Sequence, residues 1–237
     1  MKTFLVPFGM GNLGKNAGVE TAPKKIAPRA KKLEFNAQNV GQGLADIEKE
    51  ALKIKGKSVF VGGDHQVSYA LVRAFAKKRK NFSLVVFDAH PDCMDFFVPP
   101  SHEDWLRSLV EEKTVRPENI LLLGVRKIHP IERKFLKRKK IAFLSPKQAL
   151  QGKKLGEFLH RAERIYVSFD IDVFDAKLVP GTGYPEQNGF SEREGLGLLK
   201  SVLDSGKVKM ADLVEANPLK DRQGKTIRLA KKVLQLF

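Results

Sequence analysis

The residues best suited to catalysis stand directly after short apolar runs of the chain. Four such clusters occur: Gly62-Gly63-Asp64-His65, Asp88-Ala89-His90-Pro91-Asp92, Asp170-Ile171-Asp172 and Glu215-Ala216-Asn217-Pro218. Carboxylates that crowd together repel and raise one another's pKa unless a cation neutralises them. Imidazole mixed with carboxylate is a ligand set that suits Mn or Zn better than Ca or Mg. We therefore predict a metal site.

The charge of the ligand set indicates how many ions it holds. Four of these aspartates and both histidines supply up to four negative charges, which two divalent ions match better than one. Asp88-x-His90-x-Asp92 and Asp170-x-Asp172 use alternating extended positions, where side chains i and i+2 point the same way. Taken singly, each residue is more simply a cap or loop residue, but their joint occurrence favours a shared site. Two ions about 3.5 to 4 Å apart lower the pKa of a bridging water, so the expected chemistry is hydrolysis.

Strands and helices must alternate to bring these clusters to one place. Runs rich in Val, Ile, Leu and Phe predict strands at residues 3–6, 58–61, 83–87, 120–123, 141–144, 165–169 and 211–214. They are apolar on both faces, as in a buried parallel sheet. Amphipathic segments predict helices at residues 67–78, 103–112, 147–162, 191–203 and 223–236. The alternation predicts a three-layer α/β/α fold, in which ligands bind at the carboxyl ends of the strands.

Length and composition are those of a globular protein. The 237 residues fit one large domain, residues 1–237, and no long apolar run predicts a transmembrane span. The N-terminus lacks the apolar stretch of a signal peptide, so we expect a cytoplasmic location. The single cysteine, Cys93, excludes an intrachain disulfide and a cysteine-cluster zinc site.

The chain is strongly basic, with 43 Lys and Arg against 27 Asp and Glu and a net charge of +16. Basic proteins of this kind often bind nucleic acid or anionic surfaces. The cations fall mainly in helix-like stretches such as residues 77–80 and 133–140, without interleaved aromatic residues or a nucleic-acid motif. We therefore interpret them as a solvated basic surface and expect no nucleic-acid partner.

The motifs resemble those of the ureohydrolase family, which includes arginase, agmatinase, guanidinobutyrase and formimidoylglutamase. The likeness spans nearly the whole chain and includes the Pro180-Gly181-Thr182-Gly183 turn that follows the third motif. It implies an arginase-like, mainly parallel sheet of about eight strands and two Mn²⁺ per subunit. The metal ligands that it implies are His65, Asp88, His90, Asp92, Asp170 and Asp172. It also implies a small guanidino substrate and a homo-oligomer, either a trimer or a hexamer. The absence of a long apolar run leads us to expect no membrane association.

The resemblance further assigns residues that act on the substrate. Glu215 matches the glutamate that holds the guanidinium in that family, and a guanidinium offers paired donors to a carboxylate. His102 stands where the family has a proton-shuttling histidine; the alternative is a surface-loop histidine. Glu132 remains of the acidic set that recognises the head group in arginase. His129 is either a substrate contact or a surface residue.

Departures from the family pattern bear on the substrate. Met94 stands where Asn is typical, and Lys127 and His129 replace aspartates, so little remains to hold the zwitterionic end of arginine. Tyr184 stands where a Thr is common. We expect a binuclear manganese hydrolase that releases urea, agmatinase-like or arginase-like, with agmatine ahead of arginine. Lys127 could instead bind a carboxylate and favour a guanidino acid such as guanidinobutyrate.

Three alternatives stay open at this point. One is a deacetylase on the same fold, and another is a non-catalytic basic protein that uses its charge on nucleic acid. The third is dinucleotide binding, because Gly9-Met10-Gly11-Asn12-Leu13-Gly14 matches Gly-x-Gly-x-x-Gly after the first strand. That motif must open a helix, and Gly18 and Pro23 disfavour a continuous helix there.

Overall fold

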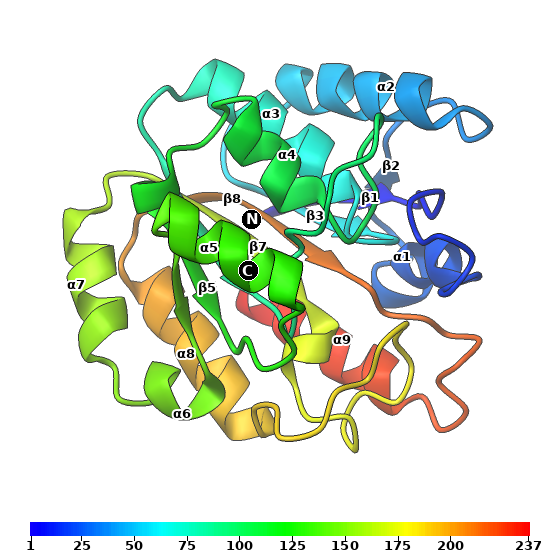
Figure 1. Cartoon of the computed structure of the whole chain (residues 1–237). Helices are drawn as coiled ribbons and strands as arrows, with labels where there is room; N and C mark the ends of the chain where they lie inside the picture. Colours follow the sequence, from blue (N-terminus) through cyan, green and yellow to red (C-terminus); the bar gives the residue numbers. More distant parts are fainter.

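A parallel β-sheet runs through the centre of the molecule in the computed structural model, which describes residues 1–237 (Figure 1). Its strands are β1 (Lys2–Val6), β2 (Lys31–Lys32), β3 (Ser58–Gly62), β4 (Ser83–Phe87), β5 (Ile120–Leu123), β6 (Ala142–Leu144), β7 (Ile165–Asp170) and β8 (Val208–Val214). Every neighbouring pair is parallel, in the order β2-β1-β3-β8-β7-β4-β5-β6. The predicted sheet of about eight strands is confirmed. The strand missed from the sequence, β2, has two exposed lysines and no apolar residue.

Helices cover both faces of this sheet. They are α1 (Ala22–Ile26), α2 (Val40–Lys53), α3 (Val67–Lys78), α4 (Trp105–Glu111), α5 (Pro130–Lys139), α6 (Pro146–Ala149), α7 (Lys153–Arg161), α8 (Glu192–Asp204) and α9 (Lys225–Leu236), with 3₁₀ turns η1 (Val19–Thr21), η2 (Pro117–Asn119) and η3 (Ile171–Val173). Helices α2 to α5 pack on one face, and α1, α7, α8 and α9 pack on the other (Figure 1). The predicted three-layer α/β/α fold is confirmed. None of the helices combines the length and apolar character that a membrane crossing requires.

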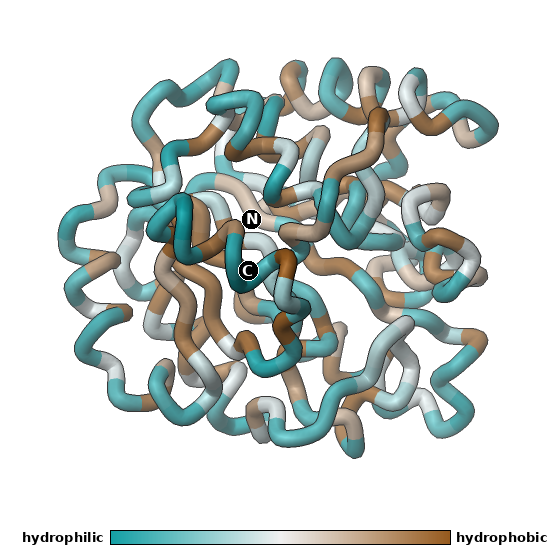
Figure 2. The backbone as a smooth tube through the Cα atoms, in the orientation of Figure 1, coloured by the Kyte–Doolittle hydropathy of each residue, from teal (hydrophilic) through white to brown (hydrophobic).

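Alternate residues of each strand belong to two different hydrophobic cores. Val59 and Val61 of β3 pack with α1, α8 and α9, whereas Phe60 between them packs with α2 and α3. Figure 2 shows hydrophobic residues along the central strands and hydrophilic ones along much of the outer helices. Because both sheet faces are covered, the strands are apolar at nearly every position, which made them recognisable in the sequence.

One predicted helix, at residues 147–162, is wrong. The chain forms α6 and α7 there, separated by a turn in which Gly152 has a left-handed backbone (φ 74°). Glycine adopts this conformation without the steric cost that other residues incur. The amphipathic pattern continues across the turn because both helices turn apolar side chains, such as Ala149 and Leu155, to the same core.

Candidate active site

The strand order brings the four polar clusters to one edge of the sheet. Strands β3, β8, β7 and β4 are consecutive and point the same way. After their carboxyl ends come, in that order, Asp64 and His65, then Glu215, then Asp172 beside the terminal Asp170 of β7, then Asp88, His90 and Asp92. Open parallel α/β sheets bind ligands at this edge.

The first group of candidate ligands surrounds Nδ1 of His65. Three carboxylate oxygens approach this atom: Asp92 Oδ2 at 2.9 Å, Asp88 Oδ2 at 3.2 Å and Asp170 Oδ2 at 3.2 Å. Asp92 has a left-handed backbone (φ 50°), and its Oδ2 also accepts a hydrogen bond from Trp105 Nε1 at 2.7 Å. Such uncommon backbone conformations cluster at functional sites. The Nδ1 atom therefore faces carboxylates at the centre of the cluster.

The second group shares Asp88 with the first. His90 Nδ1 lies 3.0 Å from Asp172 Oδ2 and 3.5 Å from Asp88 Oδ1, and ligand atoms of these residues lie within 4.8 Å of one another. The other oxygen of Asp88, Oδ2, is buried and accepts no hydrogen bond when His65 Nδ1, 3.2 Å away, is unprotonated. A buried carboxylate oxygen without a donor needs a compensating cation. This oxygen and the mixed imidazole and carboxylate donors fit divalent metal ions.

Burial and crowding set the protonation of these residues. Burial raises the pKa of Asp170 well above its usual range, and the neighbouring charges of Asp172 and Asp88 raise it further. Burial alone would lower the pKa of His65, but hydrogen bonds to the surrounding aspartates raise it well above its usual value. Metal binding would resolve this conflict, because the ligands bind deprotonated and the ion supplies the opposite charge.

A buried hydrogen-bond chain orients His65 from behind. Its Nε2 lies 2.9 Å from Ser168 Oγ, which donates to Asp212 Oδ1 at 2.7 Å. Ser168 therefore accepts from Nε2–H of His65, so in the neutral imidazole Nδ1 carries the lone pair that a metal ligand requires. Ser168 stands two residues before Asp170 in β7, so strand alternation could have revealed it. Asp212 lies inside the apolar strand β8, and nothing local marked its role.

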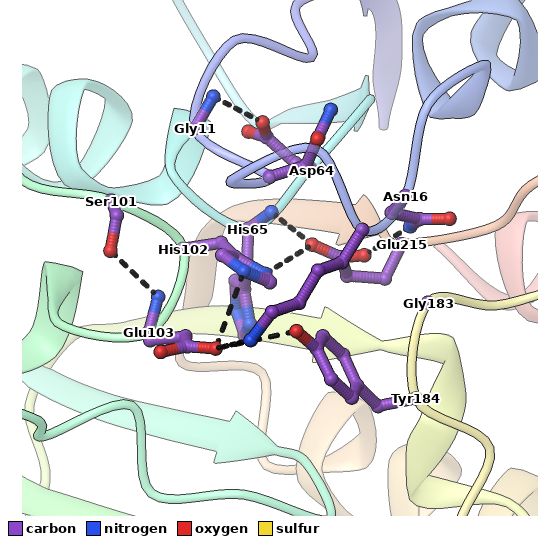
Figure 3. A network of polar contacts seen from close by, with 12 residues as sticks. Gly11, Asn16, Asp64, His65, Ser101, His102, Glu103, Gly183, Tyr184 and Glu215 are labelled. Atoms are coloured by element: carbon purple, nitrogen blue, oxygen red, sulfur yellow. Dashed lines mark hydrogen bonds and ion pairs between the residues drawn. The ribbon is translucent and has the colours of Figure 1, made fainter.

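Glu215 is buried beside the first ligand group and has a left-handed backbone (φ 66°). Its Oε1 accepts a hydrogen bond from the backbone amide of His65 at 2.7 Å, and its Oε2 accepts one from Asn16 Nδ2 at 2.6 Å (Figure 3). Burial opposes ionisation, but the hydrogen bond and the charge of His102 outweigh it and lower the pKa of Glu215. The side chain is therefore a carboxylate at neutral pH, and each oxygen keeps a lone pair for a cation.

His102 is buried, so the surface-loop alternative is wrong. Its Nδ1 lies 3.6 Å from Glu215 Oε1 and its Nε2 lies 3.8 Å from Glu103 Oε1 (Figure 3). Burial opposes protonation, but the interaction with Glu215 prevails and raises the pKa of His102 to about 9. Its backbone amide donates to Gly11 O at 3.1 Å. The imidazole is thus held between two carboxylates at the site.

The glycine-rich segment at residues 9–14 forms turns and opens no helix, so it lacks the element that dinucleotide binding needs. Asp64 Oδ2 accepts a hydrogen bond from the Gly11 amide at 2.7 Å. At Gly63, a Cβ would lie 2.0 Å from Phe8 O, so only glycine allows the chain after β1 to approach the end of β3 this closely. The segment therefore packs against the candidate site.

Glu132 and His129 form the start of α5. The Glu132 carboxylate accepts hydrogen bonds from the backbone amides of Cys93 at 3.0 Å and His129 at 2.9 Å, and His129 Nδ1 accepts one from Ile131 at 3.3 Å. This is a capping box, with His129 as the cap. Burial raises the pKa of Glu132 to about 7. Both oxygens of Glu132 accept hydrogen bonds from the backbone.

A cavity of about 350 Å³ opens over the candidate ligands, a size suited to a small molecule. His65, Glu215 and His102 line it, together with the six-residue outer rim of Met94, Glu103, Lys127, His129, Tyr184 and Glu186. The ring of Tyr184 lies beside that of His102, with centroids 5.7 Å apart. A second cavity, of about 440 Å³ near α2 and α3, contains none of these residues.

Sequence reasoning missed Asn16, which holds the carboxylate of Glu215. Asn217 Nδ2 donates to Asn16 Oδ1 at 2.7 Å, so the amide of Asn16 can face Glu215 in only one orientation without losing a bond. All three residues are buried. Asn16 and Glu215 are 199 positions apart, so no local pattern joins them.

Comparison with known proteins places the chain in a family. Residues 28–237 match the model of the Arginase family. The chain belongs to the arginase family. Arginase from Bacillus subtilis (strain 168) is 27% identical over 225 residues, which cover 84% of this chain and 76% of that protein. Agmatinase from the same organism is 31% identical over 208 residues, or 83% and 69% of the two chains. The match to mouse mitochondrial Arginase-2, 29% identical, covers 75% of this chain but 57% of that longer protein.

Solved structures share the fold of this arginase-family chain. The crystal structure of arginase from Bacillus subtilis has a TM-score of 0.84 at 24% identity and covers 99% of this chain and 96% of its own. That of formimidoylglutamase from Bacillus subtilis has a TM-score of 0.91 at 18% identity, over 99% and 84%. With the match to the Arginase family model and to agmatinase, the resemblance to ureohydrolases is confirmed. At these identities the relatives do not select a substrate.

Proposed function

We propose that residues 1–237 form one catalytic domain, a binuclear manganese-dependent hydrolase that cleaves a guanidino C–N bond and releases urea. The observation that carries this proposal is the buried carboxylate of Glu215, bonded to the amide of His65 beside two ligand groups that share Asp88. A carboxylate beside a metal centre can hold a guanidinium where its carbon is open to attack. Membership of the arginase family supports the same reaction.

The candidate ligands divide between two ions. His65, Asp88, Asp92 and Asp170 would hold one Mn²⁺, while Asp88, His90 and Asp172 would hold the other. When bound, the ions lower the pKa of water and so supply a nucleophile near neutral pH. The contribution of this chain is to fix the ligands, for which His65 depends on the hydrogen bond at its Nε2.

Glu215 binds and orients the substrate. A planar guanidinium donates to both oxygens of a carboxylate at once, which fixes the rotation of the group as well as its position. The amides of His65 and Asn16 hold those oxygens from the protein side, so the carboxylate is already oriented before a substrate arrives.

His102 supplies the proton that the leaving amine requires. An amine leaves a carbon readily only when it is protonated, and a histidine placed within reach can deliver that proton. Because Glu215 raises the pKa of His102 to about 9, the imidazolium form predominates at neutral pH. The group can then act as a general acid.

We further propose that the substrate lacks the α-amino acid head of arginine. An α-ammonium group needs a charged carboxylate near the segment at residues 127–132, where Glu132 is the one carboxylate, and burial raises the pKa of Glu132 to about 7, so its charge is incomplete at neutral pH. Met94 offers no strong hydrogen-bonding group on the same rim. Agmatine is therefore expected ahead of arginine.

A product screen with added Mn²⁺ tests the proposal. Arginine, agmatine and guanidinobutyrate would be assayed for urea and formimidoylglutamate for formamide, with chelator-treated protein as the matched control. We expect urea from at least one guanidino compound, with activity lost on chelation and restored by Mn²⁺. Protein that holds two ions per chain and releases urea from none of these compounds would contradict the proposed reaction.

The oligomeric state is a separate proposal. By analogy with its family, we propose that the chain assembles as a trimer or a hexamer. Light scattering of the purified protein would show a mass three or six times the 26.6 kDa of one chain. A monomeric mass with full activity would contradict it.

A further inference from the structure

One wall of the cavity follows β5 and leads into α5. The backbone amides of Arg126 and Lys127 both donate to Ala89 O, at 2.9 Å and 3.1 Å. Ala89 lies between the candidate metal ligands Asp88 and His90. These hydrogen bonds join the wall directly to the metal motif. They also fix the position of the Lys127 backbone, from which its side chain extends.

Arg126 ties the same wall to the opposite rim. Its guanidinium donates to the carbonyl oxygens of Asp172 at 2.8 Å, Phe174 at 3.0 Å and Glu186 at 2.9 Å. These carbonyls belong to the segment that follows β7. Because its donors are bonded to the backbone, Arg126 is not available to a ligand. Its hydrogen bonds hold the two sides of the cavity together.

Apart from the candidate ligands and Glu215, three carboxylates line the cavity, and two of them already have partners. Glu103 Oε1 lies 3.4 Å from Lys15 Nζ. The same oxygen accepts a hydrogen bond from the Tyr184 hydroxyl at 3.4 Å (Figure 3). Glu132 accepts the two backbone hydrogen bonds described above. Both side chains are held by groups of the protein before a ligand binds.

The remaining charges of the rim are those of Glu186 and Lys127. Glu186 Oε1 lies 3.7 Å from His90 Nε2, on the side of the ring away from the candidate metal. Lys127 is exposed, lines the cavity, and makes neither an ion pair nor a hydrogen bond through its ammonium group. Among the cationic Lys and Arg side chains, it alone lines the cavity.

We propose that Lys127 is a specificity-determining residue, which pairs with a carboxylate at the end of the substrate remote from the guanidinium. This inference rests on the proposed function, since Glu215 must hold the guanidinium for the tail to reach the rim. The substrate class is then a guanidino carboxylic acid. A cationic tail such as that of agmatine would bring a second ammonium beside Lys127, and like charges disfavour binding.

The effect is moderate because Lys127 is exposed. Exposed ion pairs are weakened by solvent and screened by salt. We expect kcat/KM for 4-guanidinobutyrate to exceed that for agmatine, and the ratio to fall as salt rises. Replacing the cation by an apolar chain should lower this ratio about fivefold, and charge reversal should lower it about twentyfold or more.

The experiment compares Lys127→Met and Lys127→Glu with the wild-type chain and with Lys134→Met. Lys134 is an exposed lysine of α5 that does not line the cavity, so it controls for loss of a surface charge. Each Mn-loaded protein is assayed for urea release from guanidinobutyrate, agmatine and arginine. Calorimetry measures the binding of guanidinobutyrate, and elemental analysis measures metal content.

The expected result is a guanidinobutyrate preference in the wild type and in Lys134→Met, reduced in Lys127→Met and reversed in Lys127→Glu, at unchanged metal content. The inference would be overturned if the ratio of kcat/KM for guanidinobutyrate to that for agmatine is the same in all four proteins. It would also be overturned if the wild-type chain does not bind guanidinobutyrate. Lys127-dependent binding without urea release from any guanidine would support the inference and contradict the proposed reaction. Urea release that prefers agmatine over guanidinobutyrate would support the proposed reaction and contradict the role of Lys127.

Discussion

Replacing Glu215 by glutamine separates substrate binding from metal binding, because the shape is nearly kept while the charge is lost. The carboxylate accepts hydrogen bonds from the His65 amide and from Asn16 Nδ2. A glutamine has a single oxygen, so its NH₂ group must face one of these donors. Asn16 cannot simply turn its amide round, because its Oδ1 accepts a hydrogen bond from Asn217. One buried donor is left unpaired.

Two magnitudes follow from this geometry. The unpaired donor should lower the free energy of unfolding by about 1–3 kcal/mol. In the complex, the guanidinium loses one charge-assisted hydrogen bond and keeps a neutral one, a loss of about 2–4 kcal/mol in transition-state stabilisation. Since about 1.4 kcal/mol is tenfold in rate, kcat/KM should fall roughly 30-fold to 1000-fold.

The measurements are urea-release kinetics, metal content by elemental analysis and the free energy of unfolding in denaturant. Glu192→Gln is the matched control, because Glu192 pairs only with Lys232 on an exposed surface. Metal content should stay the same in both variants. Loss of an ion from Glu215→Gln would show that Glu215 is a metal ligand. A kcat/KM within threefold of wild type would refute its role in holding the guanidinium.

Three further predictions concern the metal, the proton and the support of Glu215. Asp170→Ala should lower metal content and activity with little change in circular dichroism, because the apolar core of the sheet does not depend on it; full activity in the metal-depleted variant would refute a two-metal mechanism. The pKa of His102 is raised to about 9, so its acid form is present below that pH and is lost as pH rises through it. The value of kcat should therefore fall above about pH 9. If the same fall in kcat persists in His102→Gln, it belongs to another group. Asn16→Ala removes one hydrogen bond from Glu215 and should lower kcat/KM about fivefold to tenfold at constant metal content; an unchanged value would show that the His65 amide alone orients the carboxylate.

Local sequence could reveal the site residues that stand at the carboxyl ends of strands. His65, Asp88 and Asp170 stand at or directly after apolar runs, and a parallel sheet places all its carboxyl ends at one edge. The burial of His102 was not visible in this way. Its position depends on a hydrogen bond to Gly11, a residue 91 positions earlier in the chain.

The sequence by itself determined the class of fold and the chemistry of the cluster. Apolar residues on both faces of each strand require a covered sheet, and carboxylates crowded at strand ends require a cation. These conclusions depend only on the local order of residue types. The helix predicted at residues 147–162 failed for a related reason, since amphipathicity records which face is buried but not whether Gly152 interrupts the backbone.

Only the tertiary structure decided which strands are neighbours and which polar groups are left without partners. The position of β8 between β3 and β7 brings Glu215 next to His65, and the loop after β1 supplies Asn16 to hold it. In the same packing, the carboxylate of Glu132 accepts hydrogen bonds from two backbone amides, and Lys127 lines the cavity without an ion-pair partner. Partners of this kind lie far apart in the chain, and the free energy that selects them comes from packing the whole sheet and its helices, which no local pattern contains.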